Sequence, residues 1–164
     1  MNAMTLDKWL PFRNEGSVVR CRLFCFPHAA GNATFYRPLR RFMPPEVDFC
    51  PVELPGRAAR LREPPFTSMS ALMEKLEHAL QPLMEVPFGF FDHSVGVCMA
   101  FEAARQLRAV EGRNAVLLFV SGRGSPKFAS ADRPRHARRR TAICLQFCAG
   151  LAARLQQSCN DRNS

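Results

Sequence analysis

The feature that most constrains the fold is a repeated order of apolar runs, turns and amphipathic stretches. An apolar run over residues 18–26 is followed by a loop and by a helical stretch that begins near Phe35. A second run, residues 47–54, is followed by a turn and then by residues 68–83, whose leucines recur at helical spacing. Strands that alternate with helices are typical of an α/β protein, in which a mostly parallel sheet is flanked by helices.

The third unit carries the clearest signal for chemistry. Residues 87–91 form an apolar run, residues 97–108 form an amphipathic stretch, and Ser94 lies between them. This order predicts a nucleophile elbow, a tight strand-to-helix turn that exposes the serine hydroxyl above the sheet. The first amides of the following helix would point at an oxyanion formed there. Acyl transfer is therefore the first hypothesis.

A nucleophile elbow needs small residues two before and two after the serine, because strand and helix pass close together. Gly96 meets this requirement and Asp92 does not. An ionised Asp92 about 6 Å from an oxyanion, at an effective dielectric constant of about 20, would oppose the new charge by about 3 kcal/mol. A local hydrogen bond or protonation of the carboxylate would change this, and both alternatives stay open.

Residues 115–121 are a further continuous apolar run, from which we expect a strand buried on both faces. In parallel sheets, functional sites gather beyond the carboxyl ends of the strands. The loop after Phe26 and the elbow after Phe91 both follow such ends. We therefore expect them at the same edge of the sheet.

The 164 residues, 47% of them hydrophobic, are enough for one domain with a sizeable core and exclude a wholly disordered protein. The net charge of +9 is concentrated in residues 121–164, which carry nine Lys/Arg against two Asp/Glu. This distribution argues against a nucleic-acid-binding surface built into the fold. The amino-terminal residues resemble neither a signal peptide nor a membrane span, so we expect a cytoplasmic protein with no membrane partner.

The sequence changes character near Pro126. Five arginines crowd residues 133–140, and residues 141–157 offer only a narrow helical stripe. We therefore divide the chain into a folded part, residues 1–125, and an irregular basic extension, residues 126–164, that is disordered or partly helical. For the arginine cluster, a solvated arm is favoured over contact with nucleic acid or an acidic partner.

Seven cysteines are scattered through apolar segments without the paired spacing of metal ligands. Cys21 and Cys25 lie four residues apart on one expected strand, but no second Cys or His pair would complete a zinc site. We expect reduced cysteines in the core and no metal.

Four separated strings point to one family: residues 23–33 (LFCFPHAAGNA), 52–57 (VELPGR), 63–66 (EPPF) and 91–96 (FDHSVG). In combination and in order they resemble the type II thioesterases, α/β-hydrolase-fold enzymes of nonribosomal peptide and polyketide synthesis. The resemblance implies a partial α/β-hydrolase fold over about residues 20–125. It also implies hydrolysis of acyl thioesters on the phosphopantetheine arm of an acyl or peptidyl carrier protein, with no cofactor of the enzyme's own.

The resemblance also implies roles for individual residues. Ser94 becomes the catalytic nucleophile, and the backbone amides of Ala29 and Val95 become the oxyanion donors. Such donors must lie about 2.7–3.1 Å from the developing charge. Asp92 and Gly96 belong to the elbow.

The four histidines receive separate interpretations. His93 precedes the nucleophile and is expected to be structural, packed beneath the elbow. His28 lies in the proposed oxyanion loop and would border the substrate entrance. His78 is expected on a helix surface, and His136 lies in the basic extension.

Members of the family take the Asp and His of their Ser-His-Asp triad from segments well downstream of the elbow, and no matching strings follow here. Asp132 and His136 qualify by residue type alone, so no triad Asp or His is identified. We therefore expect a truncated thioesterase with impaired activity, because loss of triad members lowers kcat by on the order of 10⁶. A frameshift or gene disruption after Ser125 would explain the change of character.

Two other functions stay open. In the first, the elbow is only structural and the chain binds a carrier protein or another subunit without hydrolysing anything. In the second, which is weaker, the arginine cluster binds nucleic acid without sequence preference.

Overall fold

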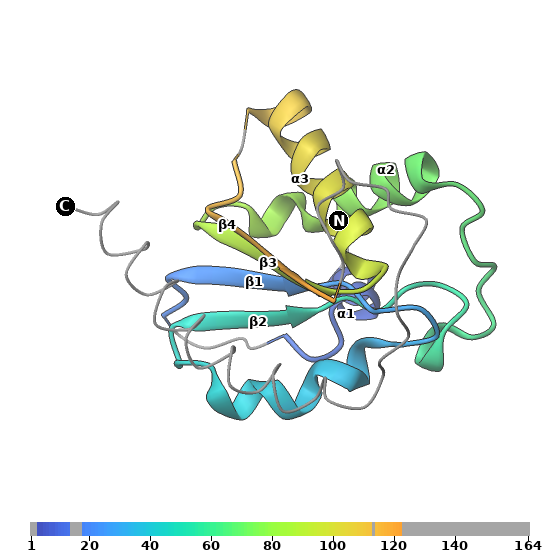
Figure 1. Cartoon of the computed structure of the whole chain (residues 1–164), viewed down its shortest axis with the longest axis horizontal. Coiled ribbons are helices and arrows are strands. Elements are labelled where there is room, and N and C mark those ends of the chain that lie inside the picture. The colour runs from blue at the N-terminus through green and yellow to red at the C-terminus, as the bar shows by residue number, and fades with distance from the viewer. Residues whose placement is uncertain (1–2, 14–17, 113, 123–164) are drawn as a thin grey trace.

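Four parallel strands form the centre of the molecule, between helices on both faces (Figure 1). The computed structural model describes residues 3–13, 18–112 and 114–122. The order of the strands across the sheet is β2 (Val47–Pro51), β1 (Cys21–Cys25), β3 (Phe88–His93) and β4 (Leu117–Ser121). The predicted α/β class with a parallel sheet is confirmed. The basic extension, residues 126–164, lies outside the described residues, and with it Asp132 and His136.

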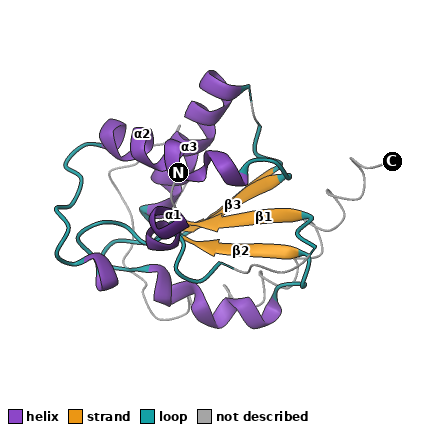
Figure 2. Cartoon of the chain, turned by 180° about the vertical axis from the view of Figure 1, so that it is seen from behind, coloured by secondary structure: helices purple, strands orange, loops and turns teal. Residues whose placement is uncertain are grey.

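Helices α2 (Met69–Leu80) and α3 (Gly96–Glu111) cover one face of the sheet, and the 3-10 helix η1 (Ala33–Phe42) covers the other (Figure 2). The short helix α1 (Ala3–Trp9) lies at the carboxyl ends of β1 and β2. There the carbonyl of Trp9 accepts a hydrogen bond from the amide of Glu53 at 2.8 Å. Two single 3-10 turns, η2 (Ala58–Arg60) and η3 (Gln81–Leu83), complete the described elements.

Side chains of β1 alternate between two hydrophobic cores, as the period of two in a strand requires. Cys21, Leu23 and Cys25 pack in the core beneath η1. Phe24 and Phe26 pack in the larger core beneath α2 and α3. Because β1 contributes to both cores, it is covered on both faces and holds the two layers together.

The helix expected to begin near Phe35 is a 3-10 helix that begins at Ala33. Asn32 precedes it in an extended conformation, and its side chain accepts a hydrogen bond from the amide of Thr34 at 3.0 Å. Pro38 lies inside the helix and has no N–H to donate. The cap and the proline together account for the earlier start and the tighter winding.

Strand β4 differs from expectation, since we predicted a strand buried on both faces. Four of its five residues are half-buried and Val120 is 36% exposed. Among the described residues β4 pairs only with β3, so its other edge has no neighbouring strand. An apolar run therefore identified the strand but not its position in the sheet.

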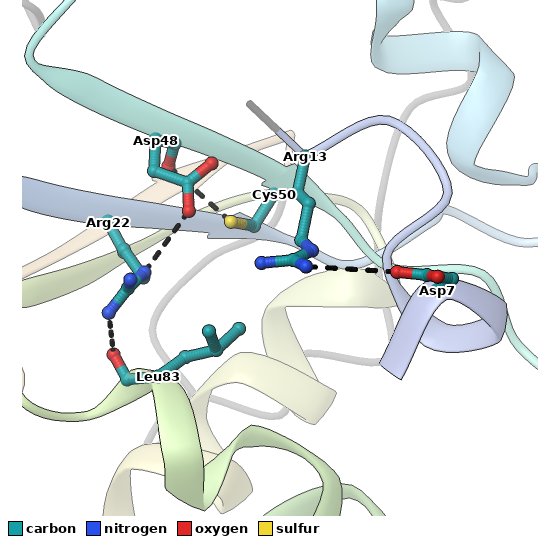
Figure 3. Close-up of polar contacts among 6 residues, drawn as sticks. All are labelled: Asp7, Arg13, Arg22, Asp48, Cys50 and Leu83. Atoms are coloured by element: carbon teal, nitrogen blue, oxygen red, sulfur yellow. Dashed lines mark hydrogen bonds and ion pairs between the residues drawn. The ribbon is translucent and has the colours of Figure 1, made fainter. Parts of the chain in front are cut away.

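A buried ion pair joins β1 to β2 (Figure 3). Arg22 and Asp48 are register partners, and the Arg22 Nε lies 3.1 Å from the Asp48 Oδ2. The Arg22 guanidinium also donates to the carbonyl of Leu83 in η3, so one side chain connects the sheet to the end of the α2 layer. Burial, with Asp48 close by, raises the pKa of the Cys50 thiol well above its ordinary value, so this thiol is protonated and unreactive.

Three of the four described cysteines lie in the core, and Cys98 is half-buried. Cys21, Cys25 and Cys50 are buried, and no disulfide joins the cysteines of the described segments. In the same segments, no group of three or more His, Cys, Asp or Glu side chains could hold a metal ion. Helices of the described part are all too short or too polar to cross a bilayer.

Candidate active site

Ser94 lies at the turn from β3 into α3, as the elbow prediction requires. Its φ of +58° is in the left-handed region, which non-glycine residues rarely adopt and which is enriched at active sites. The Ser94 amide donates to the Ser121 carbonyl at 2.9 Å, which continues the ladder between β3 and β4. Val95 follows with helical backbone and caps the start of α3. The chain therefore reverses from strand to helix within two residues.

Gly96 lets the start of α3 approach the end of β1. A Cβ atom at this position would lie 2.6 Å from the carbonyl oxygen of Phe26 and 3.3 Å from that of Pro27. No other residue type fits at this distance without a shift of the backbone. The close approach explains why a small residue is needed at Gly96, and it brings the start of α3 against the loop that follows β1.

Asp92, the elbow residue that departs from the expected pattern, is fully buried. Its Oδ1 accepts a hydrogen bond from the Phe26 amide at 2.5 Å, and its Oδ2 has no partner among the described residues. Burial raises the pKa of this carboxyl well above its ordinary value, and the bond from Phe26 only partly offsets the rise. Burial therefore favours the neutral form of Asp92, and in that form the repulsion expected of a carboxylate at this position does not arise.

The loop of residues 27–31 is held by an arginine from the turn after β2. The Arg57 Nη1 donates to the carbonyl of His28 at 3.1 Å and to that of Gly31 at 2.6 Å. Ala29 and Ala30 lie between these two carbonyls and are exposed. Ala30 has a φ of +60°, so the loop turns through a left-handed residue. The two hydrogen bonds fix the backbone on both sides of Ala29.

The family described as "Thioesterase domain" matches residues 21–158 of the chain. The chain belongs to this thioesterase family. The predicted resemblance to type II thioesterases is thereby confirmed, and with it the α/β-hydrolase relationship of the sheet and helices.

Among relatives of this chain, the gramicidin S biosynthesis protein GrsT of Aneurinibacillus migulanus is 38% identical over 131 residues, covering 80% of the chain and 51% of GrsT. The solved structure of RedJ, a thioesterase from the prodiginine biosynthetic pathway in Streptomyces coelicolor, is 33% identical. The similarity covers 81% of the chain and 52% of RedJ with a TM-score of 0.64. BorB, a type II thioesterase from the borrelidin cluster, is 31% identical, with coverages of 77% and 51% and a TM-score of 0.64. The chain spans about half the length of the curated relatives it matches.

Two residues that support the loop of residues 27–31 were not singled out from the sequence. Arg57 holds the loop carbonyls, as described above. Glu53 is buried, and its Oε2 accepts a hydrogen bond from the Ala33 amide at 3.3 Å, just beyond the loop. Burial raises the pKa of Glu53 despite Arg57 and Arg60 nearby. The available signal was a charged residue at each end of the otherwise apolar and turn-forming string VELPGR.

The described histidines, His28, His78 and His93, lie at three different places. The His28 ring packs on Phe35 with centroids 4.4 Å apart and lies 6.4 Å from the ring of His93. The Nδ1 of His93 is 3.3 Å from the Ser121 Oγ, so His93 faces β4. His78 is exposed on α2, as predicted. The ring-to-ring distance again puts the loop after β1 beside the elbow.

Proposed function

We propose that this chain supplies the nucleophile and the oxyanion donors of a serine thioesterase. Its substrates would be acyl thioesters on the phosphopantetheine arm of acyl or peptidyl carrier proteins. The observation that carries the proposal is the left-handed Ser94 between β3 and α3, beside a loop that Gly96 contacts directly. Nucleophilic attack on a carbonyl requires a serine hydroxyl held at such a turn with backbone donors nearby, and Ser94 is half-buried, so part of its surface is accessible.

In the proposed reaction, the Ser94 oxygen attacks the carbonyl carbon of the thioester. The amides of Ala29 and Val95 donate hydrogen bonds to the oxyanion. The carbon–sulfur bond then breaks, the arm leaves as a thiol after taking up a proton, and Ser94 is left as an acyl ester. Water attacks this ester, which releases the free acid and restores the Ser94 hydroxyl. No triad Asp or His is assigned within the described residues.

Two features of the surroundings support the oxyanion role. The two hydrogen bonds from Arg57 hold the backbone on either side of Ala29, so little reorganisation would be needed when charge develops. Burial raises the pKa of Asp92 and so disfavours a negative charge beneath the elbow.

The proposed setting is a cytoplasmic one, with an acyl or peptidyl carrier protein as partner and no metal or cofactor of the chain's own. The names of GrsT and RedJ refer to gramicidin S and prodiginine biosynthesis, which supports a role in making secondary metabolites.

The test is release of acyl groups from a loaded carrier protein by the whole chain, measured as free thiol. Ser94→Ala should reduce the rate to that of the uncatalysed reaction. The matched control is Ser70→Ala, because Ser70 is exposed on α2, far along the chain from the elbow. Equal rates for the unaltered chain and Ser94→Ala would reject catalysis through Ser94, and carrier binding retained without turnover would favour the non-catalytic alternative.

A further inference from the structure

A second hollow lies between the end of α1, the turns after β2 and the outer side of α2. Its volume is about 490 Å³, within the range of small-molecule pockets. None of its lining residues belongs to the elbow or to the loop of residues 27–31. The hollow is therefore separate from the candidate active site.

Two aromatic side chains that pack on one another, Trp9 and Phe66, line this hollow. Trp9 is almost fully buried and stacks on Phe66, with ring centroids 6.5 Å apart and an interplanar angle of 25°. The Arg60 guanidinium lies 4.4 Å from the centroid of the Trp9 ring. Three prolines of the adjoining turns complete the wall: Pro55, Pro64 and Pro65. A flat or extended apolar group could pack there without rearranging the chain.

Among the described residues, some charged side chains around the hollow form ion pairs and others do not. The Nε and Nη2 of Arg60 donate to Glu63 at 3.1 and 2.6 Å, and the Nη1 donates to the carbonyl of Glu53 at 3.0 Å. The hydrogen bond from Arg60 lowers the pKa of Glu63, so these two charges neutralise one another. Lys75 and His78 are exposed one turn apart on α2, and within the described segments neither forms an ion pair.

We propose that this hollow binds an amphipathic monocarboxylate, with an aromatic or medium-length apolar body. The body would pack against Trp9 and Phe66, and the carboxylate would face Lys75 and His78 at the rim. Because Arg60 is engaged by Glu63, the Lys75 ammonium is the lining cation that an anionic group would face. The site is independent of the thioesterase reaction, since it shares no residue with that site.

Trp9 is the only tryptophan of the chain, so its fluorescence reports on this hollow. We expect 4-phenylbutyrate to produce a saturable change in Trp9 emission from the whole chain. Lys75→Glu should weaken binding about tenfold through reversal of the rim charge, and the uncharged 4-phenylbutan-1-ol should bind the unaltered chain comparably weakly. Arg108→Glu, an equal change of charge at an exposed position on α3, should leave the affinity unchanged.

Ser94→Ala should also leave binding of 4-phenylbutyrate unchanged, which separates the hollow from the elbow. Absence of a saturable emission change at millimolar 4-phenylbutyrate would overturn the proposal. Equal weakening by Lys75→Glu and Arg108→Glu would overturn it as well, because the effect would then reflect net charge. Loss of binding in Ser94→Ala would place the ligand at the elbow and reject the second site.

Discussion

The carboxyl of Asp92 in β3 accepts a hydrogen bond from the backbone amide of Phe26, which directly follows β1. The carbonyl of the same Phe26 accepts from the Tyr36 hydroxyl at 2.8 Å and is the atom against which Gly96 packs. Phe26 is thus a shared contact of β3, η1 and α3. The start of the proposed oxyanion loop is positioned by all three elements together.

Asp92→Asn should stabilise the protein increasingly as the pH rises. Burial raises the folded-state pKa of Asp92 above the unfolded value of about 3.9. At a pH between these two pKa values, the unfolded state binds fewer protons than the folded state. The free energy of unfolding therefore falls by about 1.4 kcal/mol per pH unit above about pH 4, until the raised pKa is reached. Asparagine keeps an acceptor for the Phe26 amide and does not titrate.

Urea denaturation of both proteins between pH 4 and pH 8 would measure this difference. The control is Asp7→Asn, because Asp7 is exposed, and it should leave the pH dependence as it is. A difference between Asp92→Asn and the unaltered protein that stays constant across this range would contradict the prediction.

Gly96→Ala should destabilise the fold by roughly 2–4 kcal/mol, because the new methyl group would overlap the Phe26 carbonyl and neither backbone can move freely. The loss should appear as a lower midpoint of thermal or urea unfolding. Cys98→Ala, two residues further along the same helix and only half-buried, should cost less. Equal losses for the two variants would argue against the close contact at Gly96.

Ala30→Gly should stabilise the protein by about 0.5–1 kcal/mol, because Ala30 has a left-handed backbone that glycine adopts without strain. Part of the gain is offset by the greater freedom of glycine in the unfolded chain. Ala29→Gly is the matched control: it adds the same freedom at the neighbouring exposed alanine, which is not among the residues of positive φ, and should destabilise. Thermal midpoints of the two variants should therefore move in opposite directions, and a shift in the same direction would contradict the assignment.

Arg22→Met should lower the free energy of unfolding by about 3 kcal/mol, because it removes the Arg22 guanidinium from its ion pair with the buried carboxylate of Asp48. Arg105→Met removes an arginine of the same type from an exposed pair with Glu102 on α3. This second change should have little effect, because solvent screens exposed pairs. Urea denaturation of both variants compares them directly, and equal effects would show that the Arg22 pair is not buried in solution.

The sequence by itself determined the elements that depend on local chemistry. Helical spacing identified α2 to within a few residues. The structure adds its cap, in which the Ser68 Oγ accepts from the Ala71 amide at 3.2 Å. The apolar runs identified all four strands, and the elbow around Ser94 followed from a strand, a turn and a helix in immediate succession. These patterns are readable because each depends on residues within one or two turns of one another.

Only the tertiary structure decided the state of Asp92, the support of the loop and the exposure of β4. The partner of Asp92 is 66 residues away along the chain, and Arg57 reaches back to carbonyls 29 and 26 residues before it. Contacts between residues so far apart in the chain produce no periodic pattern in the sequence. An apolar run such as that of β4 is compatible both with a central strand and with an edge strand. Its burial therefore depends on which strands lie beside it. Pairing between distant segments sets burial, and burial in turn sets whether the carboxyl of Asp92 is charged.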